Sequence, residues 1–499
     1  QNGFVFSTTP GAVQFDGQVV KGGVGGFRSG GGGFNLNWDA SWDVAAQVNE
    51  DGWSAEFAIP FKSLRYGGET VQDWGINFHR IVARRNEVSF WAPLDRQHNI
   101  FRVSDAGTLK NVSVPRQRNF KITPYLLGQS RRGGTLADNS ESVTDWGLDA
   151  KYMLTPSLSL DLTYNTDFAQ VEADDVQVNL DRFSIFLPEK RPFFLENAGQ
   201  FSVGNPREVE LFFSRRIGIG SGGIQQPIES GVRLSGKVRG STNLGLLHMQ
   251  TQSINALAGN SYSVVRVNQE LANRSSLGAI YVARQGEGDQ DYNNTYAVDG
   301  RWGIGDEITV SGYLAQTETP GRRGDDQAGS LRVGWNSQAW TNHAAYSKGG
   351  ENFNPEVGFL RRSNYEKFDF MIFNRTRPSD LWGLFELRPH MYHRSYFDTD
   401  GYHESGFTHI DNHFEWHNGL EIHTGINLTH EGVREPFEIN KGTFVPAGEY
   451  DHKESQLVFM TDRKKALSGS VKSYIGGFYG GDRVAVETKV NYRLGDAFT

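Results

Sequence analysis

Residues 158–165 read Leu158-Ser159-Leu160-Asp161-Leu162-Thr163-Tyr164-Asn165, so apolar and polar side chains alternate without a break. Successive side chains of a β-strand point to opposite faces of its sheet, and the stretch therefore predicts a strand with one apolar and one polar face. Residues 484–493 repeat the pattern: one face is mostly valine, and the other carries Glu487, Lys489 and Arg493.

Similar segments recur from Asn119 to the end of the chain, separated by clusters of Gly, Asp, Asn, Ser and Arg. A tilted strand needs about 9 to 11 residues to cross the hydrocarbon layer of a bilayer, which is the length of these segments. We therefore predict an all-β chain in which residues 119–499 form a large antiparallel outer-membrane β-barrel of roughly 18–20 or more strands. Its apolar face would contact lipid, and its charged face would line a water-filled lumen. A soluble β-propeller or stacked sandwich is the alternative.

The composition excludes several other classes of protein. Only 37% of the 499 residues are hydrophobic, and no apolar run approaches the roughly 18 to 20 residues of a spanning helix, which excludes a helical membrane protein. The 33 Phe, 18 Tyr and 11 Trp are too many rings for a disordered chain. With no Cys and a net charge of −8, the chain has neither a thiol for catalysis nor the basic surface of a nucleic-acid binder.

Residues 1–115 contain shorter strand-like runs, such as Trp53 to Phe61, and we interpret them as a partial β-sandwich. Flat rings can stack on the faces of sugars, so Trp38, Trp42 and Trp53 are the candidate ligand-binding residues. The alternative is that most of these rings form the core of the sandwich.

One segment, at about residues 166–208, interrupts the alternation. Pro188 and Pro192 lie among densely mixed acidic and basic residues. A lipid-facing strand cannot contain them, because proline lacks the N–H group for a sheet hydrogen bond and the charges would have no partner in lipid. We predict that this segment folds into the lumen as a plug. Ion pairs of Lys190 and Arg191 with Asp174, Asp175 and Glu196 are expected to hold it, and the plug and lumen candidates are Asp174, Asp175, Glu189, Lys190, Arg191, Glu196, Arg215 and Arg216.

Several stretches of this chain resemble one family of bacterial outer-membrane proteins. The stretches are residues 165–201, 211–218, 231–237 and 354–359, together with Trp42-Asp43-Val44 and residues 53–64. In that family a carbohydrate-binding family 9-like sandwich precedes a large domain of unknown function that is expected to be an outer-membrane barrel. The resemblance implies a sandwich over 1–115 and a barrel over 119–499. The family's sandwich has a further stretch before Asn2 and its barrel ends on an aromatic residue, so we expect this sequence to be partial.

A histidine-rich run lies between His409 and His417. At a period of two residues it places His409, Asp411 and His413 on one face of a strand. Successive residues on one face are roughly 7 Å apart, so one metal ion could bind two neighbours and a cross-strand partner such as Glu421 or His423. We take His409, Asp411 and His413 as candidate metal ligands. The alternative is a polar lumen wall that becomes more cationic as pH falls.

No cofactor is expected, although two acidic clusters have the oxygen chemistry that calcium prefers. They are Glu172-Ala173-Asp174-Asp175 and Asp325-Asp326, and neither completes a twelve-residue calcium-binding loop. Solvated loops are the alternative explanation.

No catalytic residue is predicted, because we find no nucleophile elbow, zinc-protease motif or phosphate-binding loop. We expect a protein of the bacterial outer membrane that passes or captures a polar ligand, with saccharides as a candidate class. A membrane-anchored glycoside hydrolase or other hydrolase is one alternative, and a plugged scaffold barrel in a protein assembly is another. The expected partners are outer-membrane lipid and lipopolysaccharide, a carbohydrate ligand and a protein partner, with no nucleic acid.

Overall fold

The structure is a computed structural model of the whole chain. It describes residues 2–23, 33–36, 38–82, 87–115, 119–132, 140–166, 183–220, 225–254, 257–462 and 465–494.

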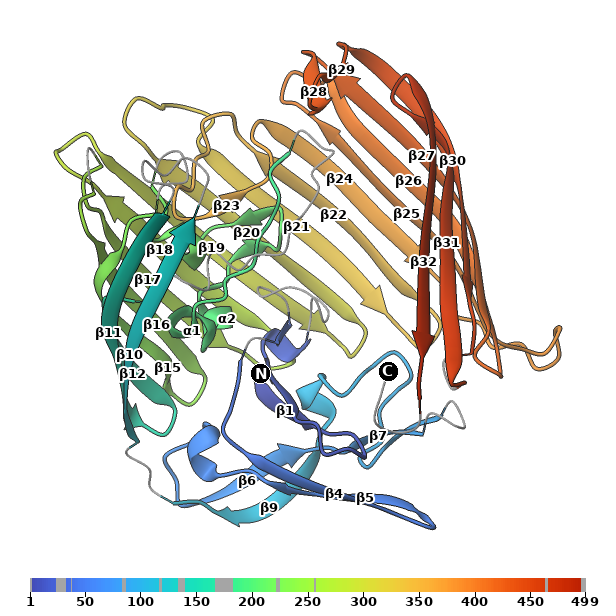
Figure 1. Cartoon of the computed structure of the whole chain (residues 1–499), viewed down its shortest axis with the longest axis horizontal. Helices are drawn as coiled ribbons and strands as arrows, with labels where there is room; N and C mark the ends of the chain where they lie inside the picture. Colours follow the sequence, from blue (N-terminus) through green and yellow to red (C-terminus); the bar gives the residue numbers. More distant parts are fainter. Residues whose placement is uncertain are drawn as a thin grey trace.

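One antiparallel sheet of 18 strands dominates the molecule, and neighbours in the sheet are almost always neighbours in the sequence (Figure 1). This confirms the predicted fold class of an all-β chain with a large antiparallel sheet, for which roughly 18–20 or more strands were expected. In order across the sheet, the strands are β10 Phe120–Arg132, β11 Ser140–Thr155, β12 Leu158–Tyr164, β15 Ile228–Arg239, β16 Thr242–Thr251, β17 Ser261–Glu270, β18 Ser276–Gln285, β19 Tyr292–Ile304, β20 Ile308–Glu318, β21 Gln327–Asn336, β22 Thr341–Gly349, β24 Tyr365–Phe373, β25 Leu384–Phe397, β26 His403–Trp416, β27 Glu421–Val433, β30 Gly448–Met460, β31 Leu467–Phe478 and β32 Gly481–Tyr492.

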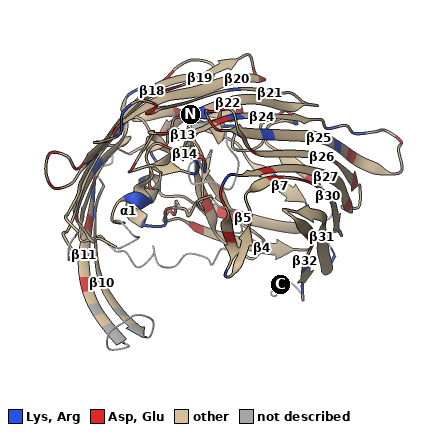
Figure 2. Cartoon of the chain, turned by 90° about the horizontal axis from the view of Figure 1, so that it is seen from above, with Lys and Arg blue, Asp and Glu red and all other residues tan. Residues whose placement is uncertain are grey.

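The sheet curves around a concave side, which we call the lumen, and Figure 2 shows this curve from above. Among the described strands, β10 and β32 are the two ends of the sheet and do not pair with each other. The alternation in the sequence gives the sheet its two faces. On β12, Ser159, Asp161 and Thr163 are buried on the concave side, whereas Leu162 and Tyr164 are exposed on the convex side.

The convex face is apolar along its length, the reverse of a water-soluble sheet. Large exposed hydrophobic side chains occur on strands from one end of the sheet to the other, including Leu126, Leu162, Val298, Leu314, Leu331, Phe368, Ile410, Ile426, Leu457, Ile475 and Val490. The sequence pattern therefore turns its apolar side outward.

Residues 183–220 lie inside the curve of the sheet (Figures 1 and 2), and we call them the plug. The plug contains two helices of one turn, α1 Pro192–Leu195 and α2 Ala198–Phe201, and two short strands, β13 Gly204–Asn205 and β14 Val209–Glu210. Strand β14 also pairs with β23 Phe359–Leu360, which belongs to the connection between β22 and β24. A second inward segment, which the sequence pattern did not reveal, therefore completes the plug.

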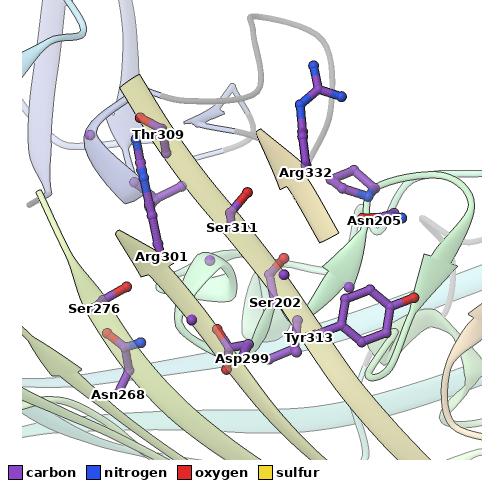
Figure 3. Close-up of a pocket in the computed structure, with 18 of the residues that line it drawn as sticks. Ser202, Asn205, Asn268, Ser276, Asp299, Arg301, Thr309, Ser311, Tyr313 and Arg332 are labelled. Carbon is purple, nitrogen blue, oxygen red and sulfur yellow. The ribbon is translucent and has the colours of Figure 1, made fainter. Parts of the chain in front are cut away.

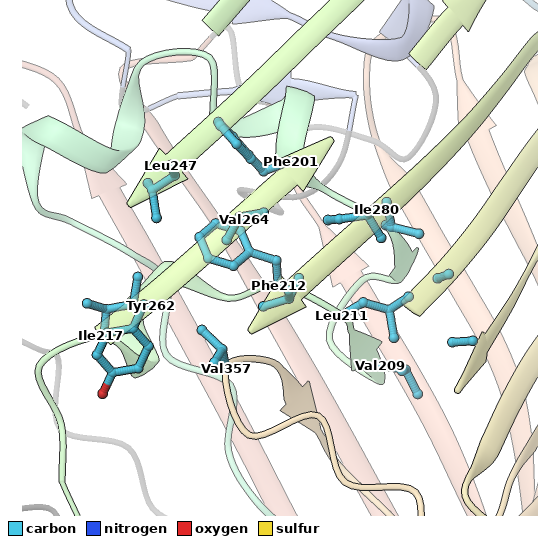
Figure 4. Close-up of a cluster of buried hydrophobic side chains, with 14 of the residues drawn as sticks. Phe201, Val209, Leu211, Phe212, Ile217, Leu247, Tyr262, Val264, Ile280 and Val357 are labelled. Atoms are coloured by element: carbon cyan, nitrogen blue, oxygen red, sulfur yellow. The ribbon is translucent and has the colours of Figure 1, made fainter. Parts of the chain in front are cut away.

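The main hydrophobic core lies between the plug and the concave face of the sheet (Figure 4). Phe201, Leu211 and Ile217 of the plug and Val357 beside β23 belong to one buried cluster with sheet residues such as Leu247, Val264 and Ile280. Gly245 of β16 is needed here, because a Cβ at this position would lie 2.8 Å from the ring of Phe201. The plug and the concave face of the sheet therefore share one hydrophobic core.

The described residues of the N-terminal region form four small antiparallel sheets at one rim of the large sheet (Figure 1). Their strands are β1 Gly3–Ser7, β2 Phe15–Val19, β3 Phe34–Asn35, β4 Asp43–Asn49, β5 Gly52–Ala58, β6 Val71–Ile76, β7 His79–Val82, β8 Glu87–Phe90 and β9 Gly107–Ser113, and a further hairpin elsewhere pairs β28 Phe437–Asn440 with β29 Thr443–Val445. Arg96 donates hydrogen bonds to the carbonyl oxygens of Gln338 and Arg375 in turns of the large sheet. No helix among the described residues is long and apolar enough to span a membrane.

Candidate functional site

A cavity of about 1250 Å³ lies in the lumen between the plug and the sheet (Figure 3). The plug contributes residues between Gly199 and Glu208, the sheet contributes residues from β16 to β25, and Asn2, Val20, Gly22 and Ser104 approach from the N-terminal region. Most of the residues that line it are of polar types, including Asn205, Asn268, Ser276, Asp299, Arg301, Thr309, Ser311 and Arg332.

Two residues, Asn205 and Glu208, fix the edge of the plug that borders this cavity. Glu208 forms an ion pair with Lys367 of β24 and accepts a hydrogen bond of 3.0 Å from the Tyr396 hydroxyl of β25. Asn205 donates hydrogen bonds of 3.2 Å to the hydroxyls of Ser330 and Ser347. The plug therefore crosses the lumen from β16 to β25 and closes one side of the cavity.

The charged side chains on the sheet wall of the cavity are mostly held in ion pairs. Arg266, which is buried, forms a two-pronged ion pair with Asp299, and Asp369 is held by Lys367 and by His343. Arg332 differs from them, because its side chain is 48% exposed and its guanidinium lies 3.9 Å from the Asp369 carboxylate. The wall thus offers a guanidinium and several hydroxyls to a polar solute.

Arg191 is the most deeply buried charge of the plug, at 0% exposure. Its guanidinium makes two hydrogen bonds of 2.8 and 2.9 Å to the Glu189 carboxylate and two more to the carbonyl oxygens of Ser214 and Ile217. Burial would raise the pKa of Glu189, but the charge and hydrogen bonds of Arg191 and the Ser214 hydroxyl outweigh it and lower the pKa. This pair ties the start of the plug to its end.

Glu196 fastens the plug to two other parts of the chain. Its carboxylate forms ion pairs with Arg65 of the N-terminal region and Lys151 of β11, so the expected pairing of Glu196 with Lys190 and Arg191 was wrong. Burial would raise the pKa of Glu196, but Arg65, Lys151 and Arg233 together bring it well below the usual range. The sequence could not show this, because the partners lie far away along the chain.

The other plug candidates are placed as follows. Asp174 and Asp175 lie outside the described residues. Lys190 is half-buried, Arg215 is buried and donates a hydrogen bond of 3.0 Å to the Pro188 carbonyl oxygen, and Arg216 is exposed and donates one of 3.2 Å to the Gly358 carbonyl oxygen.

We expect acid to loosen the plug. Glu189 and Glu196 have lower pKa values in the folded plug than the roughly 4.3 of a free glutamate, so their stabilising contribution is complete above about pH 4.3 and is lost as pH falls below it. Hydrogen exchange of amides 189–217 should therefore be faster at pH 3.5 than at pH 7, after correction for intrinsic rates. The Glu196→Gln variant should lose part of this pH dependence, and identical profiles for variant and parent would contradict the assignment.

The tryptophans proposed for sugar binding have different surroundings. Trp38 and Trp42 are buried, where Trp38 packs on Phe4 and the Trp42 ring nitrogen donates a hydrogen bond of 2.9 Å to Asp16. Trp53 is half-buried, and the Arg80 guanidinium lies over its ring at 5.4 Å. The structure therefore places the first two rings in protein contacts, and carbohydrate binding by these residues stays a prediction.

The histidine-rich run lies on β26 and faces the lumen, since its alternate residue Ile410 is exposed on the convex face. Two groups of potential metal ligands meet there, and they share Asp411. His409 and Asp411 gather with His390, whereas His413 and Asp411 gather with His423. The sequence pattern gives no sign of His390, because this residue comes to lie opposite Asp411 only through the register of β25 against β26.

Of the acidic clusters considered for calcium, Glu172 to Asp175 lies outside the described residues. Asp325 and Asp326 lie in the connection from β20 to β21, where the Asp326 carbonyl oxygen accepts a hydrogen bond from the Thr317 backbone. Calcium binding stays untested.

These features define a class: a large antiparallel sheet with an apolar convex face and a polar lumen that part of its own chain fills. Residues 118–257 match the family model described as a domain of unknown function (DUF5916). That match leaves out residues 1–115, so the carbohydrate-binding resemblance stays a prediction. No curated protein matches the chain at a significant level.

One solved structure similar to this chain is the crystal structure of Pseudomonas aeruginosa OccK11 (OpdR). The identity is 9% and the TM-score 0.25, over 75% of this chain and 86% of that chain. A similarity of that size carries no weight for the function.

Proposed function

We propose that this chain is an outer-membrane barrel protein that passes or captures a polar ligand in its lumen. The observation that carries the proposal is the inverted sheet, with apolar side chains exposed on the convex face and ion pairs and a cavity on the concave face. In a bilayer, such a sheet places its apolar face against lipid and its polar face against water. We infer the bacterial outer membrane as its location, because that membrane holds β-barrels of this kind.

The connections at the two rims suggest an orientation. At one rim the turns are short: β15 ends at Arg239 and β16 begins at Thr242, and β19 ends at Ile304 and β20 begins at Ile308. At the other rim the connections are longer, and they include the plug and the β28–β29 hairpin. Outer-membrane barrels have short periplasmic turns and longer extracellular loops. We infer that the N-terminal sheets, which contact the rim of short turns, lie on the periplasmic side.

The chemistry of the cavity favours a hydroxyl-rich or anionic solute. Arg332 keeps its side chain half exposed there, and Ser276, Thr309 and Ser311 add hydroxyls that can donate or accept hydrogen bonds. A saccharide has such groups, and a saccharide that carries an anionic group would also use the guanidinium.

Removal of the plug tests the proposal. Tyr164 at the end of β12 pairs with Ser230 of β15, so a short Gly-Ser linker can replace residues 167–227 without stretching the sheet. In planar bilayers the parent should conduct weakly, and the variant should conduct several times more because the cavity would open to both sides. Replacing the β28–β29 hairpin, residues 437–445, by the same linker is the matched control and should leave conductance unchanged.

Heat modifiability on gels shows whether each variant is folded in detergent. A plug-less variant that shifts on boiling but does not conduct would contradict passage, and it would favour the plugged scaffold as the function.

A further inference from the structure

Three adjacent strands bring four histidines around one carboxylate on the lumen wall. The register pairs His390 of β25 with Asp411 of β26, and His413 of β26 with His423 of β27. Among the described residues, the potential ligand atoms of His390, His409 and Asp411 all lie within 4.8 Å of one another, and so do those of Asp411, His413 and His423.

The spacing of the ligand atoms fits a small ion. The Nε2 atoms of His409 and His413 each lie 3.4 Å from Oδ2 of Asp411. Two ligands bound tetrahedrally to zinc at about 2.0–2.1 Å are separated by about 3.3–3.4 Å, so the distance between His409 Nε2 and Asp411 Oδ2 suits an ion that both atoms bind. This distance is longer than that of a typical direct hydrogen bond.

The outer contacts favour the group that contains His390 and His409. His409 Nδ1 lies 2.7 Å from the Asn427 side-chain oxygen, and His390 Nδ1 lies 3.0 Å from the Arg388 carbonyl oxygen. In each ring the Nδ1–H group therefore donates a hydrogen bond to one of these oxygen atoms. The lone pair of Nε2 is then directed so that it can bind a metal ion. Histidines that bind metals are oriented by contacts of this kind.

Asp411 is arranged to supply the anionic ligand. Its side chain is 0% exposed, and Oδ1 accepts a hydrogen bond of 2.9 Å from the Thr424 backbone, while Gln456 Nε2 lies 3.4 Å from Oδ2. Gly425 lies opposite Asp411 in the register, and a Cβ there would approach both the carboxylate and the His409 ring at 3.1–3.2 Å. The missing side chain makes room for the cluster.

We propose that His390, His409 and Asp411 bind a divalent transition-metal ion of the zinc class on the lumen wall. Two imidazoles and one carboxylate are borderline ligands that suit zinc, cobalt or nickel better than calcium or magnesium. The neighbouring cation Arg388 is engaged by Glu415 and Glu421, which limits its repulsion of the ion. The site is independent of whether the lumen passes a solute.

Titration of the detergent-folded chain with Co²⁺ at pH 7.5, followed by the visible absorption of the ion and by Zn²⁺ competition, tests this proposal. The parent should bind one ion, and His409→Gln should weaken binding more than about a hundredfold, beyond what loss of an outer contact costs. Asn427→Ala should weaken it about 10- to 100-fold, because it removes the contact that orients His409.

His403→Gln is the matched control, since His403 lies on the same strand and stacks on His430 of β27 but belongs to neither ligand group. It should bind as the parent does. Heat modifiability verifies that each variant is folded. Absence of binding by the parent, equal losses in His409→Gln and His403→Gln, or a loss confined to His423→Gln would each overturn the assignment to His390, His409 and Asp411.

Discussion

Replacement of Arg191 by alanine is expected to release the plug from the sheet, at a cost of about 3–5 kcal/mol in its free energy of unfolding. The guanidinium is fully buried and occupied by the Glu189 carboxylate and the carbonyl oxygens of Ser214 and Ile217. Alanine would remove the guanidinium that faces the buried Glu189 carboxylate and that donates to two carbonyl oxygens, which is the costly way to break such a pair.

The effect should be local, because the long strands keep their own backbone hydrogen bonds. Hydrogen exchange of residues 189–217 is the measurement, and protection should fall there while the strands of the large sheet remain protected. Bilayer conductance should rise in the same variant if the plug limits passage.

Arg216→Ala provides the matched control. Arg216 is an exposed arginine of the same segment, and it donates a hydrogen bond of 3.2 Å to the Gly358 carbonyl oxygen. Its loss should cost about 1 kcal/mol or less. The double variant Glu189→Gln with Arg191→Met should recover part of the loss, because it removes both charges of the buried pair together. Equal protection in Arg191→Ala and Arg216→Ala would refute the role of the buried pair.

Replacement of Leu314 by arginine is expected to oppose insertion of the sheet into lipid. Leu314 lies on β20 with its side chain 69% exposed on the convex face, between the buried lumen-side residues Tyr313 and Ala315. An arginine on the lipid face of a barrel costs about 2–4 kcal/mol near the bilayer midplane. Urea titration of the heat-modifiable, folded fraction in phosphatidylcholine vesicles measures this cost.

The same substitution at Thr309 separates lipid exposure from a general intolerance of arginine in β20. Thr309 lies on the same strand but lines the cavity of about 1250 Å³, and it pairs with Gly303 and Gly334 on the neighbouring strands, so a charged side chain can be hydrated there. Thr309→Arg should therefore insert almost as the parent does. If Leu314→Arg folded into vesicles as readily as Thr309→Arg, the convex face would not be in contact with lipid.

The sequence predicted the strands and their two faces because alternation is a local property. From Leu158 to Tyr164 the polarity of each residue predicts which face of the sheet its side chain lies on. The structure confirms this prediction, because Asp161 is buried on the lumen side and Leu162 is exposed on the convex side. Pro188 and Pro192 likewise excluded a lipid-facing strand by their chemistry, and the described part of that segment lies inside the curve of the sheet.

The candidate site could be predicted only in part. His409 and Asp411 were visible as neighbours on one face of a strand, whereas His390 became a partner only through the register of β25 against β26. Glu196 lies in the segment that the sequence pattern marked as irregular, but its partners Arg65 and Lys151 come from two distant parts of the chain.

The sequence by itself therefore determined the class of fold, the length of the strands and the side each residue faces, because these depend on polarity over a few residues. Only the tertiary structure decided the ion pairs of the plug, the cavity beside it and the ligand groups around Asp411. Those features depend on strand register and on contacts between residues far apart in the chain, which local alternation does not encode.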